Sequence, residues 1–113
     1  MRFDTQAGGE PEVFASGMKR DHQTAKVRYD LAFDGPMFER YAELLTRGAA
    51  RYEPRNWMLA NGQEELERAR ASAVRHFVQW YRGDVDEDHA AAIWFNVNLA
   101  EYVKDRIERG TGR

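Results

Sequence analysis

Residues 90–100 constrain the fold of this chain more than any other stretch, because they are apolar on almost every side of a helix. A helix that is apolar all round is buried on more than one side. A chain of 113 residues forms only a modest core, which covers one side of such a helix. We therefore expect the other side to contact a second subunit, and we predict a homo-oligomer. The expected interface consists of Ala91, Trp94, Phe95 and Asn98.

Apolar residues at helical spacing predict three α-helices, over residues 37–52, 63–82 and 86–109. Pro54 follows the first segment and Gly83 follows the second, and both residue types are common just beyond a helix end. The sequence therefore predicts an all-α fold, a small bundle of three main helices.

The N-terminal residues 1–36 show little periodicity and predict an irregular, basic arm ahead of a helical domain at 37–113. A short strand is expected around residues 26–31. The length fits one domain overall.

The same spacing predicts which residues face the core. The stripe on the second helix consists of Leu66, Ala69, Ala73, Phe77 and Trp80. The stripe on the third helix consists of Ile93, Leu99, Val103 and Ile107.

Composition narrows the class of protein. Hydrophobic residues make up 42% and charged residues 32% of the chain, which is typical of a folded domain. The net charge of −2 does not favour a duplex-DNA-binding protein. There is no cysteine, which excludes disulfides and thiolate metal sites. The sequence has neither an apolar run of membrane-spanning length nor the apolar core of a signal peptide, so we expect a cytoplasmic protein without membrane contact.

Two polar residues, His89 and Asn96, share one face of the third helix with Ile93 and Val103. A buried polar group costs free energy unless it is hydrogen-bonded, so both side chains need partners. They either brace the core or belong to a functional site, and the residues alone leave both interpretations open.

Further candidates lie at the helix ends near His89. Asp86 comes three residues earlier and can share its face, with Glu87 and Asp88 as alternatives. At least one of these acids is expected to cap the helix. On the second helix, His76 borders the apolar stripe, either as a functional residue or as a half-buried contact between helices.

Glu39 and Glu43 are four residues apart on the first helix, which lines up two carboxylates on one face. Such a pair can share a divalent cation, since Mg²⁺ prefers carboxylate oxygens and water. The alternative is an ordinary solvated acidic face, in which Glu43 pairs with Arg47.

Asn56 and Trp57 lie in the predicted loop between the first two helices. An indole and an amide suit stacking on a nucleobase and recognition of its edge. Alternatively, Trp57 covers the end of the core. The cations that could contact phosphates, or be ordinary surface residues, are Lys19, Arg20, Lys26 and Arg28 in the arm and Arg75 on the second helix.

At these residues the chain resembles a phage-associated family, the N-terminal domain of phage dATP/dGTP diphosphohydrolases. That family is related in function to MazG-like nucleotide pyrophosphohydrolases. The matching stretches are RFDT at 2–5, KRD at 19–21, KVRYDL at 26–31, GAARY at 48–52, RNW at 55–57, RH at 75–76, GDVDEDH at 83–89 and WFN at 94–96. Each motif is short, but they occur in order along almost the whole chain.

The resemblance implies hydrolysis of dATP or dGTP to the monophosphate and pyrophosphate, with Mg²⁺ or Mn²⁺. The MazG-like group is all-α and usually dimeric or tetrameric, and its metal site combines an EExxE motif with a later ExxD motif. In this chain, Glu39 and Glu43 give ExxxE, and Asp86 and His89 give DxxH. Histidine is not a favoured ligand of Mg²⁺.

The resemblance also assigns roles. It gives Glu39, Glu43 and Asp86 to the metal, and it gives His76, His89 and Asn96 to catalysis. Asn56, Trp57 and the five cations named above are assigned to substrate binding. The rival interpretation is a non-catalytic helical module of phage origin that binds a nucleotide or a protein.

Overall fold

The computed structural model describes residues 10–20 and 26–110. These residues belong to two compact units, 1–32 and 33–113, which are treated separately below. In the first unit, β1 (Glu12–Val13) pairs antiparallel with β2 (Lys19–Arg20). The rest of this paired segment is a tight turn, closed by a 2.8 Å hydrogen bond from the Phe14 amide to the Met18 carbonyl.

The prediction of a strand around residues 26–31 is wrong. Residues Tyr29–Phe33 form a 3₁₀ helix, η1. Two local contacts favour this compact conformation: the Leu31 amide donates to the Arg28 carbonyl at 3.2 Å, and the Arg28 guanidinium holds Asp30 with contacts of 2.9 and 2.7 Å.

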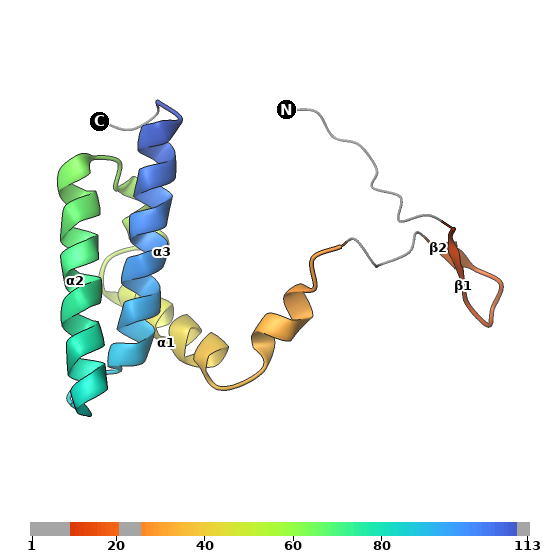
Figure 1. Ribbon diagram of the computed structural model, residues 1–113, viewed down its shortest axis with the longest axis horizontal. Coiled ribbons are helices and arrows are strands. Elements are labelled where there is room, and N and C mark those ends of the chain that lie inside the picture. Colours follow the sequence, from red (N-terminus) through yellow and green to blue (C-terminus); the bar gives the residue numbers. More distant parts are fainter. Residues whose placement is uncertain (1–9, 21–25, 111–113) are drawn as a thin grey trace. The chain divides into compact units, whose positions relative to one another are not determined.

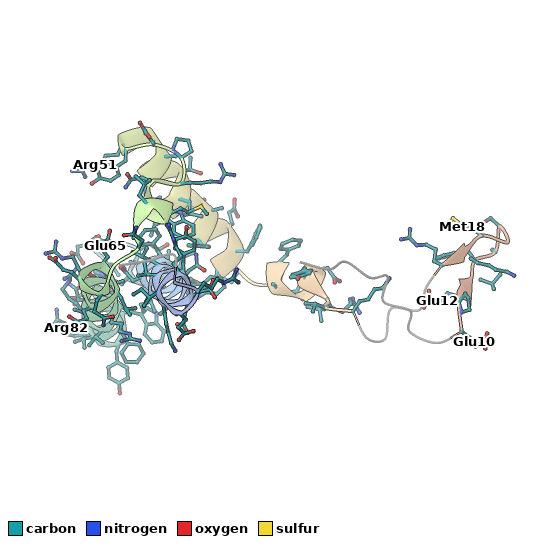
Figure 2. The ribbon with its side chains drawn as sticks, turned by 90° about the horizontal axis from the view of Figure 1, so that it is seen from above. Glu10, Glu12, Met18, Arg51, Glu65 and Arg82 are labelled. Atoms are coloured by element: carbon teal, nitrogen blue, oxygen red, sulfur yellow. The ribbon has the colours of Figure 1, made fainter. Side chains whose placement is uncertain are left out.

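The second unit contains α1 (Met37–Arg51), a short 3₁₀ helix η2 (Asn56–Leu59), α2 (Gln63–Arg82) and α3 (His89–Glu108). Helix α3 is the centre of this unit, because α2, α1 and η2 all pack against it. Figure 1 shows α2 and α3 running side by side, and Figure 2 shows the same pair nearly end-on. The described chain is thus mostly helical, as predicted.

Helix α2 begins and ends where the sequence predicts. At its start, the Glu65 carboxylate accepts hydrogen bonds from the backbone amides of Gly62 at 3.0 Å and Asn61 at 2.9 Å. These bonds satisfy amides that the helix leaves without partners. At its end, Gly83 takes a left-handed conformation, with φ of 88°, which stops the helix.

Helix α3 begins at His89, three residues later than predicted. The reason is Asp88, whose side chain caps the helix by accepting from the Ala91 amide at 3.0 Å. The same carboxylate is held by the guanidinium of Arg40, with contacts of 2.8 and 2.6 Å. Asp86 therefore lies in the turn before the helix.

The core is built largely from small side chains. Ala69 on α2 and Ala100 and Val103 on α3 are buried, together with Leu66 and Ala60. Ala91 and Ala92, near the start of α3, are buried as well. Small residues let the backbones of α2 and α3 come close, so the space between them is filled without large aromatic rings.

The prediction that Phe77 and Trp80 on α2 face the core is wrong. These two residues are 49% and 50% exposed. His76 is 8% exposed and takes the inward position instead, because its ring makes a hydrogen bond to α3. The predicted interface needs a similar correction, since Ala91 is fully buried within the chain. Trp94 remains half-exposed.

Within the described residues, no helix is both long and apolar enough to span a membrane.

Candidate functional site

His76 and His89 meet between the C-terminal end of α2 and the start of α3. Their Nδ1 atoms are 2.9 Å apart, and their ring planes are tilted by 40°. The two residues are only 8% and 2% exposed. The chain therefore brings two of the residues predicted for catalysis into direct contact, thirteen residues apart in the sequence.

Asp86 sets the state of this pair. Its Oδ1 lies 2.8 Å from His89 Nε2, so an ionised Asp86 accepts the hydrogen that this nitrogen carries. In a neutral His89 ring the lone pair is then on Nδ1, and His76 Nδ1 donates to it. The hydrogen bond to His89 also keeps the pKa of the Asp86 carboxyl below its usual value.

Burial lowers the pKa of His76, because the charged imidazolium loses its contact with water. The neighbouring Arg75 and His89 act in the same direction, while the negative charges of Glu87 and Asp86 oppose them. The ring is therefore held in its neutral form at neutral pH. A neutral imidazole keeps a lone pair that can bind a proton or a metal ion.

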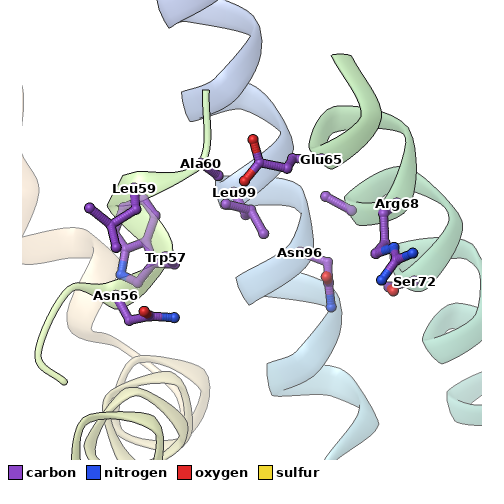
Figure 3. Close-up of a pocket in the computed structure, with 10 residues that line it drawn as sticks. Asn56, Trp57, Leu59, Ala60, Glu65, Arg68, Ser72, Asn96 and Leu99 are labelled. Carbon is purple, nitrogen blue, oxygen red and sulfur yellow. The ribbon is translucent and has the colours of Figure 1, made fainter. Parts of the chain in front are cut away.

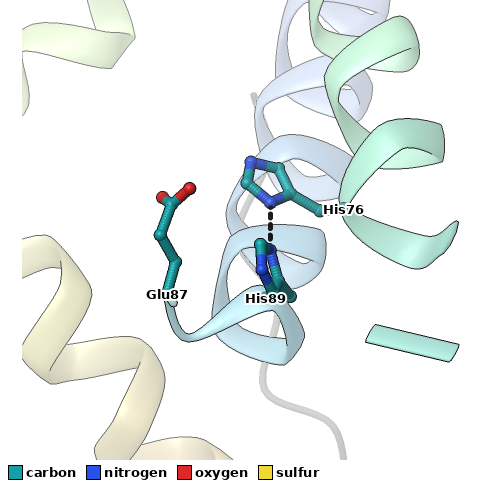
Figure 4. Close-up of side chains that lie close together, drawn as sticks. All are labelled: His76, Glu87 and His89. Carbon is teal, nitrogen blue, oxygen red and sulfur yellow. Dashed lines mark hydrogen bonds between the residues drawn. The ribbon is translucent and has the colours of Figure 1, made fainter. Parts of the chain in front are cut away.

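Two carboxylates of the turn complete this neighbourhood. An oxygen of Glu87, a nitrogen of His76 and a nitrogen of His89 all lie within 4.8 Å of one another, so the three side chains could share a metal ion. Figure 4 shows these side chains. Asp84 and Asp86 form a second group of this kind with His89. His89 belongs to both groups, so we call His76, Asp84, Asp86, Glu87 and His89 the histidine cluster.

The contact between Arg40 and Asp88 ties α1 to the edge of the histidine cluster. The guanidinium and the helix amide together hold the pKa of Asp88 at about 2. The residue therefore stays ionised at neutral pH and fixes the start of α3 next to His89. Neither Arg40 nor this pairing was predicted, and a contact between residues 48 positions apart leaves no local signal in the sequence.

A cavity of about 390 Å³ lies between η2, α2 and α3. Its polar lining comes from Asn56, Glu65, Arg68, Ser72 and Asn96, and Trp57 and Leu99 are among its apolar neighbours. Figure 3 shows Arg68 and Ser72 on α2 and Asn96 on α3, with Asn56 and Trp57 on η2. Three predicted residues, Asn56, Trp57 and Asn96, are thus gathered around one cavity.

The Asn96 side chain makes a hydrogen bond within α3: its Nδ2 donates to the Ala92 carbonyl at 2.9 Å. Trp57 is likewise partly structural, since its ring packs edge-on against Tyr102 with 5.1 Å between centroids. Both residues still line the cavity. The contacts support a structural role for each residue, and the functional role of each stays a prediction.

The cavity and the histidine cluster lie along the same pair of helices. Ser72, at the cavity, precedes His76 by four residues, which is about 6 Å along the helix axis. Asn96 follows His89 by seven residues, two turns of α3. The described residues therefore place two polar regions in succession, one with an aromatic ring and one with imidazoles.

A second, larger cavity of about 980 Å³ adjoins the first. Leu44 and Ala49 on α1 and Tyr52, just beyond the end of α1, form one wall, and Phe95 belongs to the other. Asn56, Trp57 and Arg68 line both cavities. Sequence reasoning did not single out Arg68, because an exposed arginine on a charged helix face looks like ordinary solvated surface.

The remaining predicted residues of the second unit, Glu39, Glu43 and Arg75, neither line the two cavities nor belong to the histidine cluster. Glu39 and Glu43 are exposed on α1 and belong to neither group of potential metal ligands found among the described residues. Arg75 is exposed beside His76. Lys19, Arg20, Lys26 and Arg28 are exposed residues of the first unit, where Arg28 is already paired with Asp30.

The second unit is a small helical domain with a buried pair of histidines and a polar cavity on the same two helices. The whole chain can be placed in a known class. It matches the family described as dATP/dGTP diphosphohydrolase, N-terminal, over residues 16–110. Because this match covers most of the chain, the chain belongs to that family, and the resemblance noted from the sequence is confirmed. Comparisons with curated proteins and with solved structures gave no match.

Proposed function

We propose that this chain is a nucleotide pyrophosphohydrolase, which converts dATP or dGTP to the deoxynucleoside monophosphate and pyrophosphate. The observation that carries the proposal is the family match over residues 16–110. That range includes the histidine cluster and all the residues that line the 390 Å³ cavity. The family's description names dATP and dGTP, which makes purine deoxynucleotides the first substrates to test.

In the proposed mechanism, the cavity holds the base. Trp57 offers a ring for stacking, and Asn56 and Asn96 offer amides for the edge of a purine. Arg68, which lines both cavities, offers a guanidinium to a phosphate oxygen. The cations of the arm and Arg75 are further proposed phosphate contacts.

In the reaction itself, the oxygen of a water molecule bonds to the α-phosphorus, and the proton that this water loses passes to the solvent. The bond from the α-phosphorus to the bridging oxygen breaks, and pyrophosphate leaves with the electron pair of that bond. The histidine pair orients the water or gives a proton to a phosphate oxygen. The contact between Asp86 and His89 keeps the His89 ring in one orientation for either role. This arrangement follows the general pattern of a base positioned by a carboxylate.

The predicted Mg²⁺ site has to meet a strict requirement, because Mg²⁺ prefers a nearly octahedral set of oxygen ligands. Among the described residues, both groups of potential ligands include a histidine, and neither includes Glu39 or Glu43. The residues of one chain therefore do not fit the predicted Mg²⁺ site of Glu39, Glu43 and Asp86. No step of the mechanism above involves that ion, and a requirement for Mg²⁺ or Mn²⁺ stays a prediction.

The proposal also keeps the predicted homo-oligomer, a dimer or a tetramer in the cytoplasm of a bacterium or a phage-infected cell. Its support is the number of large apolar residues that one chain leaves uncovered. Trp94 and Val97 on α3 are 45% and 47% exposed, although both lie on the helix that forms the centre of the unit. Exposed apolar patches of this kind mark surfaces that bind other proteins.

The proposed function is tested by incubating the full chain with each dNTP and Mg²⁺ or Mn²⁺, and then separating the products by chromatography. We expect dAMP or dGMP together with pyrophosphate. The variants His89→Ala and Asn96→Ala should lose this activity and remain folded. Arg109→Gln is a control, because Arg109 is an exposed residue at the far end of α3 that contacts Asp105.

Release of dNDP and inorganic phosphate would refute the proposed reaction. Absence of turnover with every nucleotide and metal would favour the binding module instead. Melting curves of the two variants separate loss of function from loss of folding, since 1 kcal/mol shifts the melting temperature of a domain of this size by roughly 4–8 °C.

A further inference from the structure

The histidine cluster has a feature that the proposed reaction does not require: two imidazole nitrogens point at each other from different helices. The Nδ1 atoms of His76 and His89 are 2.9 Å apart, and each residue is more than nine-tenths buried. Two such nitrogens in contact share either one hydrogen or one cation. Neutral imidazole is the commonest metal ligand among side chains.

A carboxylate lies close to the histidine pair. An oxygen of Glu87, the exposed residue two positions before His89, is within 4.8 Å of the histidine nitrogens, and Figure 4 shows it with both rings. Two histidines and one glutamate form a common ligand set for Zn²⁺, with a fourth position left for water. Imidazole-rich sites select transition metals over Mg²⁺.

The distances suit such an ion. Zn²⁺–N bonds of about 2.0–2.1 Å at a tetrahedral angle place two nitrogens about 3.3 Å apart. The observed separation of 2.9 Å would therefore have to increase by only a few tenths of an ångström. Glu87 belongs to the short turn between α2 and α3, where a side chain can move inward without disturbing a helix.

Asp86 supplies the second-layer contact that a metal-binding histidine usually has. It accepts the Nε2 hydrogen of His89 at 2.8 Å, which leaves the Nδ1 lone pair directed at His76. Carboxylates that bond the far nitrogen of a ligating histidine fix its tautomer and orientation, and losing one typically weakens metal binding by about 10–100-fold.

A buried acceptor nearby is also without a donor. Gln79 lies three residues after His76 on α2, and its Oε1 has no hydrogen-bond partner within the part of the chain that the structure describes. Residues three apart share a helix face. Gln79 therefore presents this acceptor on the side of α2 that carries His76.

The other possible ligand group, Asp84, Asp86 and His89, is a weaker candidate. This group contains only one histidine, His89, whereas the first group contains two. The Asp84 carboxylate is also already paired with the Arg82 guanidinium at 2.6 Å. This group would also take Asp86 away from its role in orienting His89. The geometry therefore favours the site that contains both histidines.

We propose that His76, His89 and Glu87 bind one transition-metal ion, best represented by Zn²⁺, with Asp86 orienting His89. The ion takes the place of the hydrogen between the two Nδ1 atoms, and the neutral His76 ring then carries its hydrogen on Nε2. The ion thereby joins α2 to the start of α3. This site is distinct from the carboxylate site for Mg²⁺ that the sequence suggested. It depends on the geometry of the histidine cluster and not on the proposed reaction, so either can fail without the other.

The test uses the full chain, treated with a chelator and dialysed, and then titrated with Zn²⁺ alone or Co²⁺ alone. We expect one equivalent of Zn²⁺ per chain by calorimetry, a rise in melting temperature, and the visible absorption of tetrahedral Co²⁺. An equal concentration of Mg²⁺ should not compete. Absence of Zn²⁺ and Co²⁺ binding, or displacement of either ion by equal Mg²⁺, would overturn the proposal.

Matched variants identify the ligands. His76→Gln and His89→Gln should each abolish stoichiometric binding, and Asp86→Asn should weaken it by about 10–100-fold. Glu87→Gln should also weaken binding, and because Glu87 is exposed this variant tests the site even if a histidine variant does not fold. Asp84→Asn is the control and should bind Zn²⁺ normally. Loss of binding in Asp84→Asn with normal binding in Glu87→Gln would overturn the assignment.

Discussion

The two faces of α2 differ in a way that a single chain does not explain. Toward α3 the helix presents Ala69 and His76, both buried. Away from α3 it carries Val74, Phe77, Val78 and Tyr81, which are 64%, 49%, 49% and 81% exposed. These four residues, which we call the outer stripe, have the spacing of an amphipathic helix face. Helix α2 thus buries one face and leaves these four large apolar residues of the other face largely uncovered.

This difference teaches that hydrophobicity alone did not select the face that packs inward. The inner face is shaped for close contact between two helices and for the hydrogen bond between His76 and His89. The outer stripe is shaped for contact area, with Phe77 and Tyr81 stacked at 6.4 Å between ring centroids. A surface of that kind is more typical of a protein interface than of solvated helix.

The largest effect is expected at the inner face. Ala69→Leu inserts three carbons where the residue is 2% exposed, and it should destabilise the chain by about 1–3 kcal/mol through overpacking. Thermal or denaturant unfolding measures the change. Ala71→Leu is the matched control on the exposed side of the same helix, with an expected change within about 0.5 kcal/mol. Equal effects at both positions would remove the distinction between the two faces.

The outer stripe is tested by Phe77→Asp. If this surface contacts a second subunit, a buried charge should break that contact, and light scattering should show a fall from a multiple of 13.1 kDa toward 13.1 kDa. Gln63→Asp introduces the same charge at the exposed start of α2 and should leave the mass unchanged. A wild-type chain that is already a stable 13.1 kDa monomer at micromolar concentration would contradict both this prediction and the proposed oligomer.

The smallest effect on stability is expected at the edge between the two faces, where the exposed Arg68 lines both cavities. Arg68→Gln should change unfolding by no more than about 0.5 kcal/mol, as for other surface substitutions. Under the proposed function it should instead raise KM for dATP or dGTP several-fold, because a guanidinium contact to phosphate is lost. An unchanged KM would contradict the proposed contact between Arg68 and a phosphate of the substrate.

The sequence predicted the helices well because their spacing and end signals are local. Residues 63–82 matched α2 at both ends, since Glu65 and Gly83 act within a few positions of where they stand. The start of α3 was missed because Asp88 and Asp86 both suit a helix start. Only Arg40, far away in the sequence, shows which of them is fixed at the cap.

The site was harder to predict than the helices. His76, His89 and Asp86 were chosen correctly as neighbours at the helix ends, but their chain of hydrogen bonds depends on how α2 is rotated. Phe77 and Trp80 are the more hydrophobic residues and suggested a different rotation. The helical period of 3.6 residues shows which residues share a face of a helix. It does not show which of two apolar faces the partner helix will contact.

The arrangement of contacts around α3 has a consequence for how quickly the parts of this domain form. Helices α2 and α3 are joined by a short turn, so their pairing closes a small loop, which costs little chain entropy. Helix α1 is fastened to the start of α3 by Arg40 and Asp88, across 48 positions. Local pairs form faster than distant ones. We therefore expect the α2–α3 hairpin to form first, with the histidines already facing each other, and α1 to dock onto it afterwards.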